Sequence, residues 1–159
     1  MPRHPGAPVS ESPSLAFDEF AAALPEAVAA LRTLSQSAGE GLERALVELI
    51  KVRASQINGC AYCLQLHVNW ARKAGVAPGK LDQLAVWRDA VGFSAAERAA
   101  LAWTEALTEV QGEQIPPARQ ALREHFSDEQ VLRLTLAVAA INAWNRIAGP
   151  LRFTPPPAA

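Results

Sequence analysis

The hydrophobic residues of this chain recur every three or four positions over most of its length, which is the period of an amphipathic α-helix. Apolar and polar residues do not alternate between hairpin turns, so the pattern predicts an all-α fold with about six to seven helices. The predicted helices cover residues 15–35, 41–57, 60–75, 78–90, 94–110, 116–126 and 127–148.

Proline, glycine and serine residues predict where several of these helices begin, bend or end. Pro25 interrupts the backbone hydrogen-bond ladder and is expected to split or kink the first helix. The dipeptide Asn58-Gly59 favours a turn between the second and third helices. Capping boxes, in which a serine and the residue three positions later bond each other's backbone, are predicted at Ser94 with Glu97 and at Ser127 with Gln130.

The ends of the chain and its last helix have distinct compositions. The last helix is apolar on nearly every side, which predicts burial of all its faces in a core or between subunits. Residues 1–13 and 154–159 are rich in proline and small residues. We expect flexible tails there, on either side of one helical domain over residues 14–153.

Composition narrows the class of protein. The 159 residues are half hydrophobic and carry a net charge of −1, which fits one soluble globular domain. Since the chain has no basic run, we expect no nucleic-acid partner. The first residues contain no apolar signal-peptide core, and arginine and asparagine interrupt the most apolar segment, residues 131–147. We therefore expect no membrane span and a cytoplasmic location.

The two cysteines of the chain, Cys60 and Cys63, form a Cys-x-x-Cys pair, and His67 follows four positions later. If a helix begins near Cys60, all three side chains lie on one stripe. A helix N-terminus favours the thiolate form of cysteine, and a nearby imidazole can take a proton from a thiol and return it to a leaving oxygen. This arrangement predicts redox chemistry.

Two other interpretations of the cysteine pair stay open. A zinc site needs four ligands, and only His67 and His125 could add histidine ligands outside the first residues, so a metal-binding module is the weaker alternative. The pair could also be structural, since buried cysteines often act as small hydrophobes. Thioredoxin-like proteins use the same cysteine spacing, but their fold needs strands that this pattern does not predict. We predict no metal and no cofactor.

Glu48, Cys60-x-x-Cys63 and His67 resemble the signature of AhpD-like alkylhydroperoxidases of the carboxymuconolactone decarboxylase superfamily. Residues 49–59 and 141–148 also resemble small members of that family, so the likeness covers roughly residues 15–153. It implies an AhpD-like helical fold in which Cys63 attacks peroxide and Cys60 resolves it as a disulfide. It also implies a proton relay of Glu48 and His67. A helix-dipole argument alone would favour Cys60 as the reactive thiol.

One position departs from the family pattern. The best-known peroxidases of the family have a histidine just before the second cysteine, where this chain has Tyr62. A phenol, with an ordinary pKa of about 10, is a poor base near neutral pH. Tyr62 is therefore either an accessory residue of the relay or a packing residue beside the active thiol.

The resemblance leads to a thiol-dependent alkyl hydroperoxidase or disulfide reductase, with a small hydroperoxide as substrate and an unidentified dithiol as reductant. Family members that act as decarboxylases lack the cysteine pair, which argues against decarboxylation. The alternative is a redox-sensing or binding protein without efficient turnover. The resemblance also implies a homo-oligomer, a trimer or a hexamer. Residues 144–146 could line the active pocket or form a subunit contact, and we favour the subunit contact.

Overall fold

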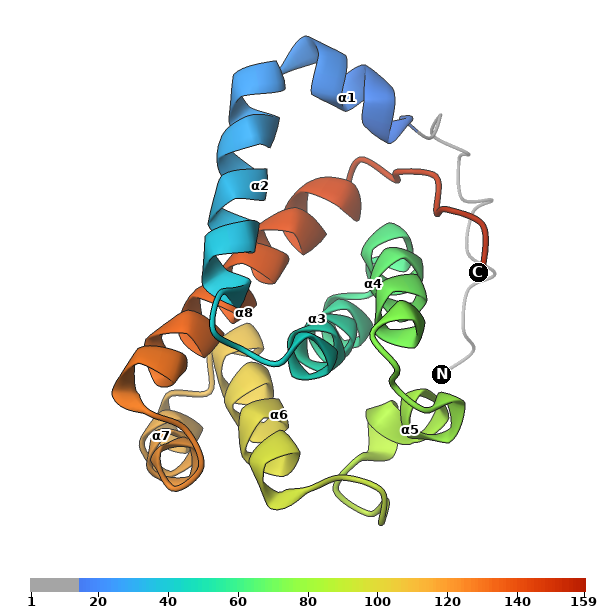
Figure 1. The fold of residues 1–159 in the computed structure, drawn as a ribbon. Helices are drawn as coiled ribbons and strands as arrows, with labels where there is room; N and C mark the ends of the chain where they lie inside the picture. Colours follow the sequence, from blue (N-terminus) through green and yellow to red (C-terminus); the bar gives the residue numbers. More distant parts are fainter. Residues whose placement is uncertain (1–14) are drawn as a thin grey trace, which may run out of the picture.

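The computed structural model describes residues 15–159, in which α-helices and 3₁₀ turns follow one another and no strand occurs (Figure 1). The all-α prediction is confirmed. The helices are α1 Phe17–Ala23, α2 Pro25–Gly39, α3 Arg44–Asn58, α4 Ala61–Lys73, α5 Pro78–Gln83, α6 Ala95–Thr108, α7 Ile115–Arg123 and α8 Asp128–Ala148, with 3₁₀ turns η1 Leu84–Val86 and η2 Gly112–Gln114. The predicted tail over residues 1–13 lies outside the described residues.

The number of helices exceeds the predicted six to seven because Pro25 divides the first one. Leu24 leaves the helical conformation, with φ −134° and ψ 58°, and Pro25 takes the first position of α2. A residue before proline is disfavoured in the α region, whereas proline fits the first turn of a helix. Figure 1 shows that α1 runs in a different direction from α2.

Helix α3 is the centre of the fold, because α4, α6 and α8 all pack against it. Its apolar residues Leu49, Ile50 and Val52 are almost completely buried. Buried aliphatic side chains of this size each stabilise the fold by about 1.5–3 kcal/mol relative to an exposed position. The central place of α3 fixes the direction of every side chain that it carries.

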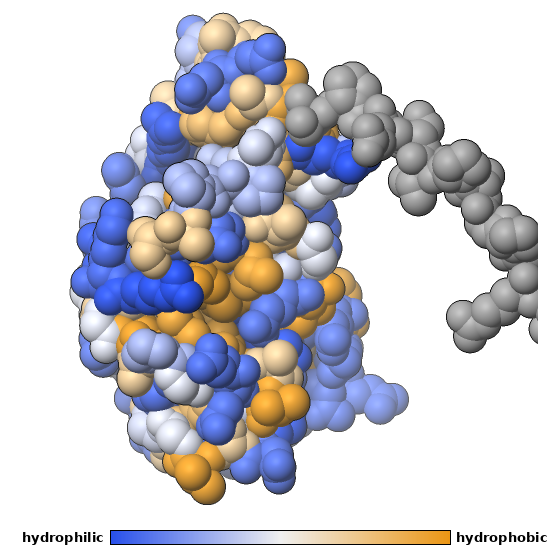
Figure 2. All heavy atoms as spheres, turned by 90° about the vertical axis from the view of Figure 1, so that its right-hand side faces the viewer, coloured by the Kyte–Doolittle hydropathy of each residue, from blue (hydrophilic) through white to orange (hydrophobic). Residues whose placement is uncertain are grey.

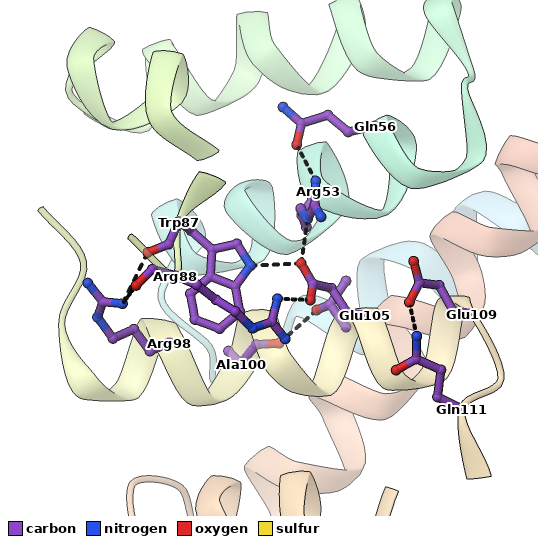
Figure 3. A network of polar contacts seen from close by, with 10 residues as sticks. Arg53, Gln56, Trp87, Arg88, Arg98, Ala100, Glu105, Glu109 and Gln111 are labelled. Carbon is purple, nitrogen blue, oxygen red and sulfur yellow. Dashed lines mark hydrogen bonds and ion pairs between the residues drawn. The ribbon is translucent and has the colours of Figure 1, made fainter. Parts of the chain in front are cut away.

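A polar network on Glu105 ties α3 to α6 and to the segment after η1 (Figure 3). The carboxylate of Glu105 accepts hydrogen bonds from Arg53 Nε and from Trp87 Nε1, each at 2.7 Å, and pairs with Arg88. Burial alone would raise the pKa of Glu105, but these donors lower it. A buried carboxylate is tolerated here because three donors compensate its desolvation.

The predicted capping boxes are confirmed, while the predicted helix over residues 78–90 is shorter than expected. Ser94 caps α6 with Glu97, and Ser127 caps α8 with Gln130. Helix α5 ends at Gln83 and continues only as η1. Beyond η1, the guanidinium of Arg98 binds backbone carbonyls of the following loop, those of Trp87, Arg88, Ala90 and Phe93. The helical pattern of the sequence therefore continues past the end of α5 and η1, into a loop whose backbone carbonyls are bound by the Arg98 side chain.

Helix α8 is not buried on all its faces within the single chain. Leu134, Val138 and Ile141 lie in the core, whereas Leu132 and Leu136 are 67% and 44% exposed. Helices α2, α3 and α6 cover the other faces of α8 and leave this one open. The prediction of complete burial is therefore wrong for the chain alone, and burial between subunits stays a prediction.

The segment after α8 runs beside α4. Asn69 Nδ2 donates to the carbonyl of Pro157 at 2.9 Å, and Arg72 donates to that of Ala159 at 2.8 Å. The side of the molecule that carries α4 and this segment is seen in Figure 2, where apolar side chains gather near the middle and hydrophilic ones surround them. Among the described residues, no helix has the length and apolarity needed to span a membrane.

Candidate thiol site

The turn at Asn58-Gly59 folds α4 back against α3 and brings the predicted site residues together. Gly59 adopts a left-handed conformation, with φ 65° and ψ 28°, which a glycine takes without steric cost. The amide of Cys60 then donates to the carbonyl of Ser55 at 3.1 Å and closes the end of α3. As a result, α3 and α4 form a helical hairpin whose facing sides carry Glu48 and His67.

Glu48 and His67 are in direct contact inside this hairpin. Glu48 Oε2 lies 2.7 Å from His67 Nδ1, and the two residues are 4% and 6% exposed. A carboxylate can only accept a hydrogen bond, so a neutral imidazole donates from Nδ1 and keeps Nε2 as a proton acceptor. Burial lowers the pKa of His67, although the hydrogen bond and charge of Glu48 oppose this. The ring is therefore neutral near pH 7 and suited to act as a base.

The two cysteines occupy the first turn of α4 and are both free thiols. Cys60 is the N-cap residue, and its sulfur accepts a hydrogen bond from the amide of Cys63 at 3.3 Å. Cys60 and Cys63 are 1% and 2% exposed. The predicted placement of both thiols at a helix N-terminus is confirmed, and the amide of Cys63 that donates to the Cys60 sulfur favours negative charge there.

The thiols titrate as a pair, with opposite shifts of their pKa values. A hydrogen bond from the thiol of Cys63 lowers the pKa of Cys60 to about 7 against the effect of burial. The same hydrogen bond, together with burial and the charge on Cys60, raises the pKa of Cys63. The pair therefore loses its first proton near neutral pH and holds the second firmly, as coupled acids do.

Access and charge distinguish the cysteines in opposite ways. Cys63 lines a cavity of about 920 Å³, together with Glu48, Tyr62 and His67, whereas Cys60 does not line it. Charge thus favours the thiolate on Cys60, while access favours reaction at Cys63. A proton moving between the two sulfurs reconciles these tendencies, because it transfers the negative charge to the sulfur that faces the cavity.

Apolar side chains from several helices form most of the remaining cavity wall. Helix α3 presents Val47, α4 presents Leu66 and Trp70, and α8 presents Ile141 and Trp144. The imidazole of His67 and the indole of Trp70 pack edge to face, with ring centroids 5.1 Å apart and ring planes at 83°. The site can hold an apolar molecule next to Cys63.

Tyr62 packs among aromatic rings at the rim of this cavity. Its ring stacks on that of Phe17, with centroids 6.0 Å apart, and meets Phe153 edge-on at 5.5 Å. Burial raises the pKa of Tyr62, so its phenol stays protonated at neutral pH. Of the two interpretations of Tyr62, packing therefore has direct contacts in its favour, and a role as a base does not.

Asn145 of α8 lies behind the cysteines rather than on an outer surface, contrary to our expectation. It is 3% exposed, donates to Ser55 Oγ at 3.1 Å and accepts from Asn58 Nδ2 at 2.9 Å. Hydrogen bonding from its amide lowers the pKa of both thiols. Its neighbour Trp144 lines the cavity, and only Arg146 of the three is exposed.

A signal for Asn145 exists in the sequence. An asparagine in a helix that is otherwise apolar is costly to bury unless a specific partner satisfies its amide. Residues 142 and 145 of α8 are both asparagines, one turn apart, and both bind Asn58. That spacing indicates a shared polar partner for the two amides.

The described residues give no support to the metal-binding alternative. In residues 15–159, no three side chains of His, Cys, Asp or Glu gather in a way that could hold a metal ion. His125, which could have completed such a site, is exposed just after α7, away from the cysteines. The histidine that lines the same cavity as Cys63 is His67.

Comparison with known proteins places the site in a family context. The model of the carboxymuconolactone decarboxylase family matches residues 18–106, which include all the thiol-site residues of α3 and α4. The uncharacterized protein YdfG of Bacillus subtilis is 38% identical over 108 residues, which are 67% of this chain and 74% of YdfG.

Solved structures share most of the fold. A protein of unknown function from Agrobacterium tumefaciens, with a suggested role in antioxidant defence as AhpD, is 41% identical, with a TM-score of 0.82 over 87% of this chain and 96% of that one. An uncharacterized peroxidase-related protein from Ralstonia eutropha, described as an alkylhydroperoxidase AhpD core, is 26% identical, with a TM-score of 0.77 over 86% of this chain and 74% of that one.

Proposed function

This chain belongs to the carboxymuconolactone decarboxylase family, and from that membership and its buried thiol pair we propose that it is an AhpD-like thiol peroxidase acting on organic hydroperoxides. The observation that carries the proposal is that Cys63 and a neutral His67 lie in the wall of one largely apolar cavity, with the thiol of Cys60 beside Cys63 in the first turn of α4. Such a site can bind a hydroperoxide, activate a sulfur and resolve the product.

In the proposed reaction, the thiolate of Cys63 attacks one peroxide oxygen and the O–O bond breaks. His67 takes the thiol proton and returns it to the departing alkoxide, which leaves as an alcohol. Cys63 becomes a sulfenic acid, and the sulfur of Cys60 attacks it. A Cys60–Cys63 disulfide forms, and the oxygen leaves as water with the remaining thiol proton. One hydroperoxide thus consumes two thiols.

An external dithiol completes the proposed cycle. Thiol–disulfide exchange returns two electrons and two protons to Cys60 and Cys63, and leaves the donor oxidised. The chemical identity of the donor stays open, and the same cycle with a disulfide substrate in place of the peroxide would be a disulfide reductase.

Steady-state turnover tests the proposal. Reduced protein receives cumene hydroperoxide and excess dithiothreitol, and loss of peroxide is followed together with the protein thiols. We expect many turnovers per chain and none from a Cys60→Ser, Cys63→Ser double variant. Peroxide loss at the rate of the double variant contradicts the proposal.

A redox sensor is the second candidate, favoured by the almost complete burial of both thiols and by Tyr62 in place of a histidine. A sensor forms the Cys60–Cys63 disulfide once and is not reset fast enough to turn over. It predicts one equivalent of peroxide consumed per chain even with dithiol present. Repeated turnover in the steady-state assay rejects this candidate.

We also propose that the protein is a homo-oligomer, and that the open face of α8 contributes to its interface. Leu132 and Leu136 lie one turn apart on that face, and both are exposed in the single chain. Light scattering after size-exclusion chromatography gives the mass in solution. A trimer or hexamer is expected, with dissociation in the Leu132→Glu variant. A monomer at high concentration contradicts this part of the proposal.

A further inference from the structure

Lys51 is a buried lysine in the wall of the thiol cavity that the peroxidase cycle does not use. It lies three positions after Glu48 on α3, and the two share a stripe with Arg44 and Val47 that lines the cavity. Only 8% of Lys51 is exposed. Lysine is almost never buried to this extent unless its charge is paired. We therefore expect an anionic partner for the amine of Lys51.

No such partner is found among residues 15–159. The amine of Lys51 has no carboxylate within 4.0 Å and makes no hydrogen bond, unlike Lys80, which pairs with Glu97. The described residues also contain no fully enclosed polar side-chain atom without a hydrogen bond. The nitrogen of Lys51 is therefore accessible, and the open space next to it is the cavity.

The other charged side chains of the cavity leave Lys51 available for an anion. Among the acids, Glu48 is held by His67, and Glu40 lies 3.4 Å from Arg133. Asp18, the third acid, is an exposed residue of α1.

The other positively charged side chains of the cavity differ in their surroundings. Arg32 lies over the ring of Phe17, 5.3 Å from its centre. Arg44 lies about two helical turns before Lys51 and adds a second positive charge to the same stripe.

The titration of Lys51 agrees with an incomplete ion pair. Burial lowers the pKa of Lys51, the charge of Glu48 raises it, and that of Arg44 lowers it further. An anion beside the amine would restore the stability of its charged form. Because three carboxylates also line the cavity, a singly charged anion fits better than a doubly charged phosphate.

We propose that Lys51 binds the carboxylate of an amphipathic hydroperoxide, such as a fatty-acid hydroperoxide, while its peroxide group lies at Cys63. The inference rests on the proposed peroxidase function and specifies its substrate class. The carboxylate pairs with Lys51 and lies near the charge of Arg44, and the hydrocarbon chain lies against Leu66 and Trp144. Lys51 is thus a specificity residue that takes no part in the electron transfer.

The spacing of the residues supports this arrangement. Lys51 and Glu48 are neighbours on α3, as His67 and Cys63 are on α4, and such neighbours lie about 5–6 Å apart between Cβ atoms. The contact between Glu48 and His67 joins the two pairs across the hairpin. The amine and the reactive sulfur are therefore close enough for one medium- or long-chain molecule to reach both.

The test compares the hydroperoxide of linoleic acid with that of its methyl ester, which has the same chain but no charge. The measured quantity is the ratio of kcat/KM for the acid to kcat/KM for the ester. We expect this ratio to fall at least about tenfold in Lys51→Met, as for the loss of one charge-assisted contact, and to be largely kept in Lys51→Arg. The control is Lys73→Met, which removes an exposed lysine of α4 and should keep the wild-type ratio. An unchanged ratio in Lys51→Met overturns the inference.

A second measurement uses binding alone, so that it does not depend on turnover. Laurate should slow alkylation of the wild-type thiols by iodoacetamide far more than 1-dodecanol does, because only laurate carries a carboxylate. Equal protection by the two overturns the inference whether or not the protein is a peroxidase. If cumene hydroperoxide is turned over while laurate and dodecanol protect equally, the peroxidase proposal stands and the role of Lys51 is rejected.

Discussion

Glu48 and His67 come from different helices, yet the carboxylate of one lies 2.7 Å from the imidazole of the other, and almost no solvent reaches either. Their contact fixes the orientation of the ring and occupies Nδ1. The other ring nitrogen is then the one that can exchange a proton with the cysteines.

Replacing Glu48 with glutamine should slow the reaction of the thiols with peroxide by at least about tenfold, the range for an interaction that supports a general base. Glutamine keeps the size of the side chain but removes the negative charge, so the imidazole becomes less basic. Stopped-flow measurement of disulfide formation with cumene hydroperoxide gives the rate. Glu40→Gln is the control, since Glu40 lines the cavity but does not contact His67. Equal rates in the wild type and Glu48→Gln contradict a relay.

The burial of His67 should make the stability of the fold depend on pH. Its pKa is lowered in the folded state, so below the unfolded value of about 6.5 the unfolded chain binds a proton that the folded chain does not. The contribution of neutral His67 is therefore present above about pH 6.5 and is lost as the pH falls below it.

Urea unfolding of the wild type and of His67→Gln over a series of pH values tests this sign. The difference in unfolding free energy between the two should shrink as the pH falls from about 7.5 to 5.5. His125→Gln, which removes an exposed histidine, controls for histidine loss in general. A difference that grows toward acid pH would mean that Glu48 keeps His67 charged in the folded state.

The thiol pair should titrate in one step near neutral pH. Because a hydrogen bond from Cys63 lowers the pKa of Cys60 to about 7, thiolate absorbance near 240 nm should report one thiolate per chain between about pH 5 and 9. Cys63→Ala removes that donor, so the remaining thiol should titrate at higher pH. Two thiolates per chain that both appear above about pH 8 would show that the thiols act independently.

Separate serine variants should distinguish the two cysteines. Cys63→Ser should abolish peroxide consumption, because Cys63 is the sulfur that lines the cavity. Cys60→Ser should still react once with peroxide and accumulate a sulfenic acid, which dimedone labels for mass spectrometry. A sulfenic acid on Cys60 in the Cys63→Ser variant would exchange the two roles and would agree with charge, rather than access, as the deciding factor.

Asn145→Ala should raise the apparent pKa of the thiol pair, because the amide of Asn145 lowers the pKa of both cysteines. The loss of its hydrogen bonds to Ser55 and Asn58 should also cost about 1–3 kcal/mol of unfolding free energy. Asn142→Ala is the matched control, since Asn142 also binds Asn58 but does not affect the thiols. The same thiol titration in both variants would make Asn145 purely structural.

Local signals in the sequence predicted much of the fold. Each capping box combines a serine with a side chain three positions later, so the starts of α6 and α8 needed no knowledge of the tertiary structure. The left-handed turn at Gly59 was predictable for the same reason. By contrast, the loop after η1, where the sequence predicts helix up to residue 90, is held by Arg98, a residue of α6. Tertiary contacts of this kind leave no local pattern.

The candidate site was predicted only in part. Spacing places Cys60, Cys63 and His67 on one helix, but burial of Glu48 depends on how α3 and α4 pack, which the resemblance rather than the pattern supplied. The pattern favours a subunit contact over the pocket for Asn145, since the distance of Asn145 from the cysteines along the chain hides its place behind them. The cavity around Lys51 exists only once α2, α3, α4 and α8 meet.

A single turnover without reductant shows whether the thiol pair reduces a hydroperoxide. Fully reduced protein receives substoichiometric cumene hydroperoxide, and the alcohol product and the Cys60–Cys63 disulfide are quantified together by mass spectrometry. We predict one alcohol and one intramolecular disulfide for each hydroperoxide consumed. Intact peroxide with both thiols still free would contradict it.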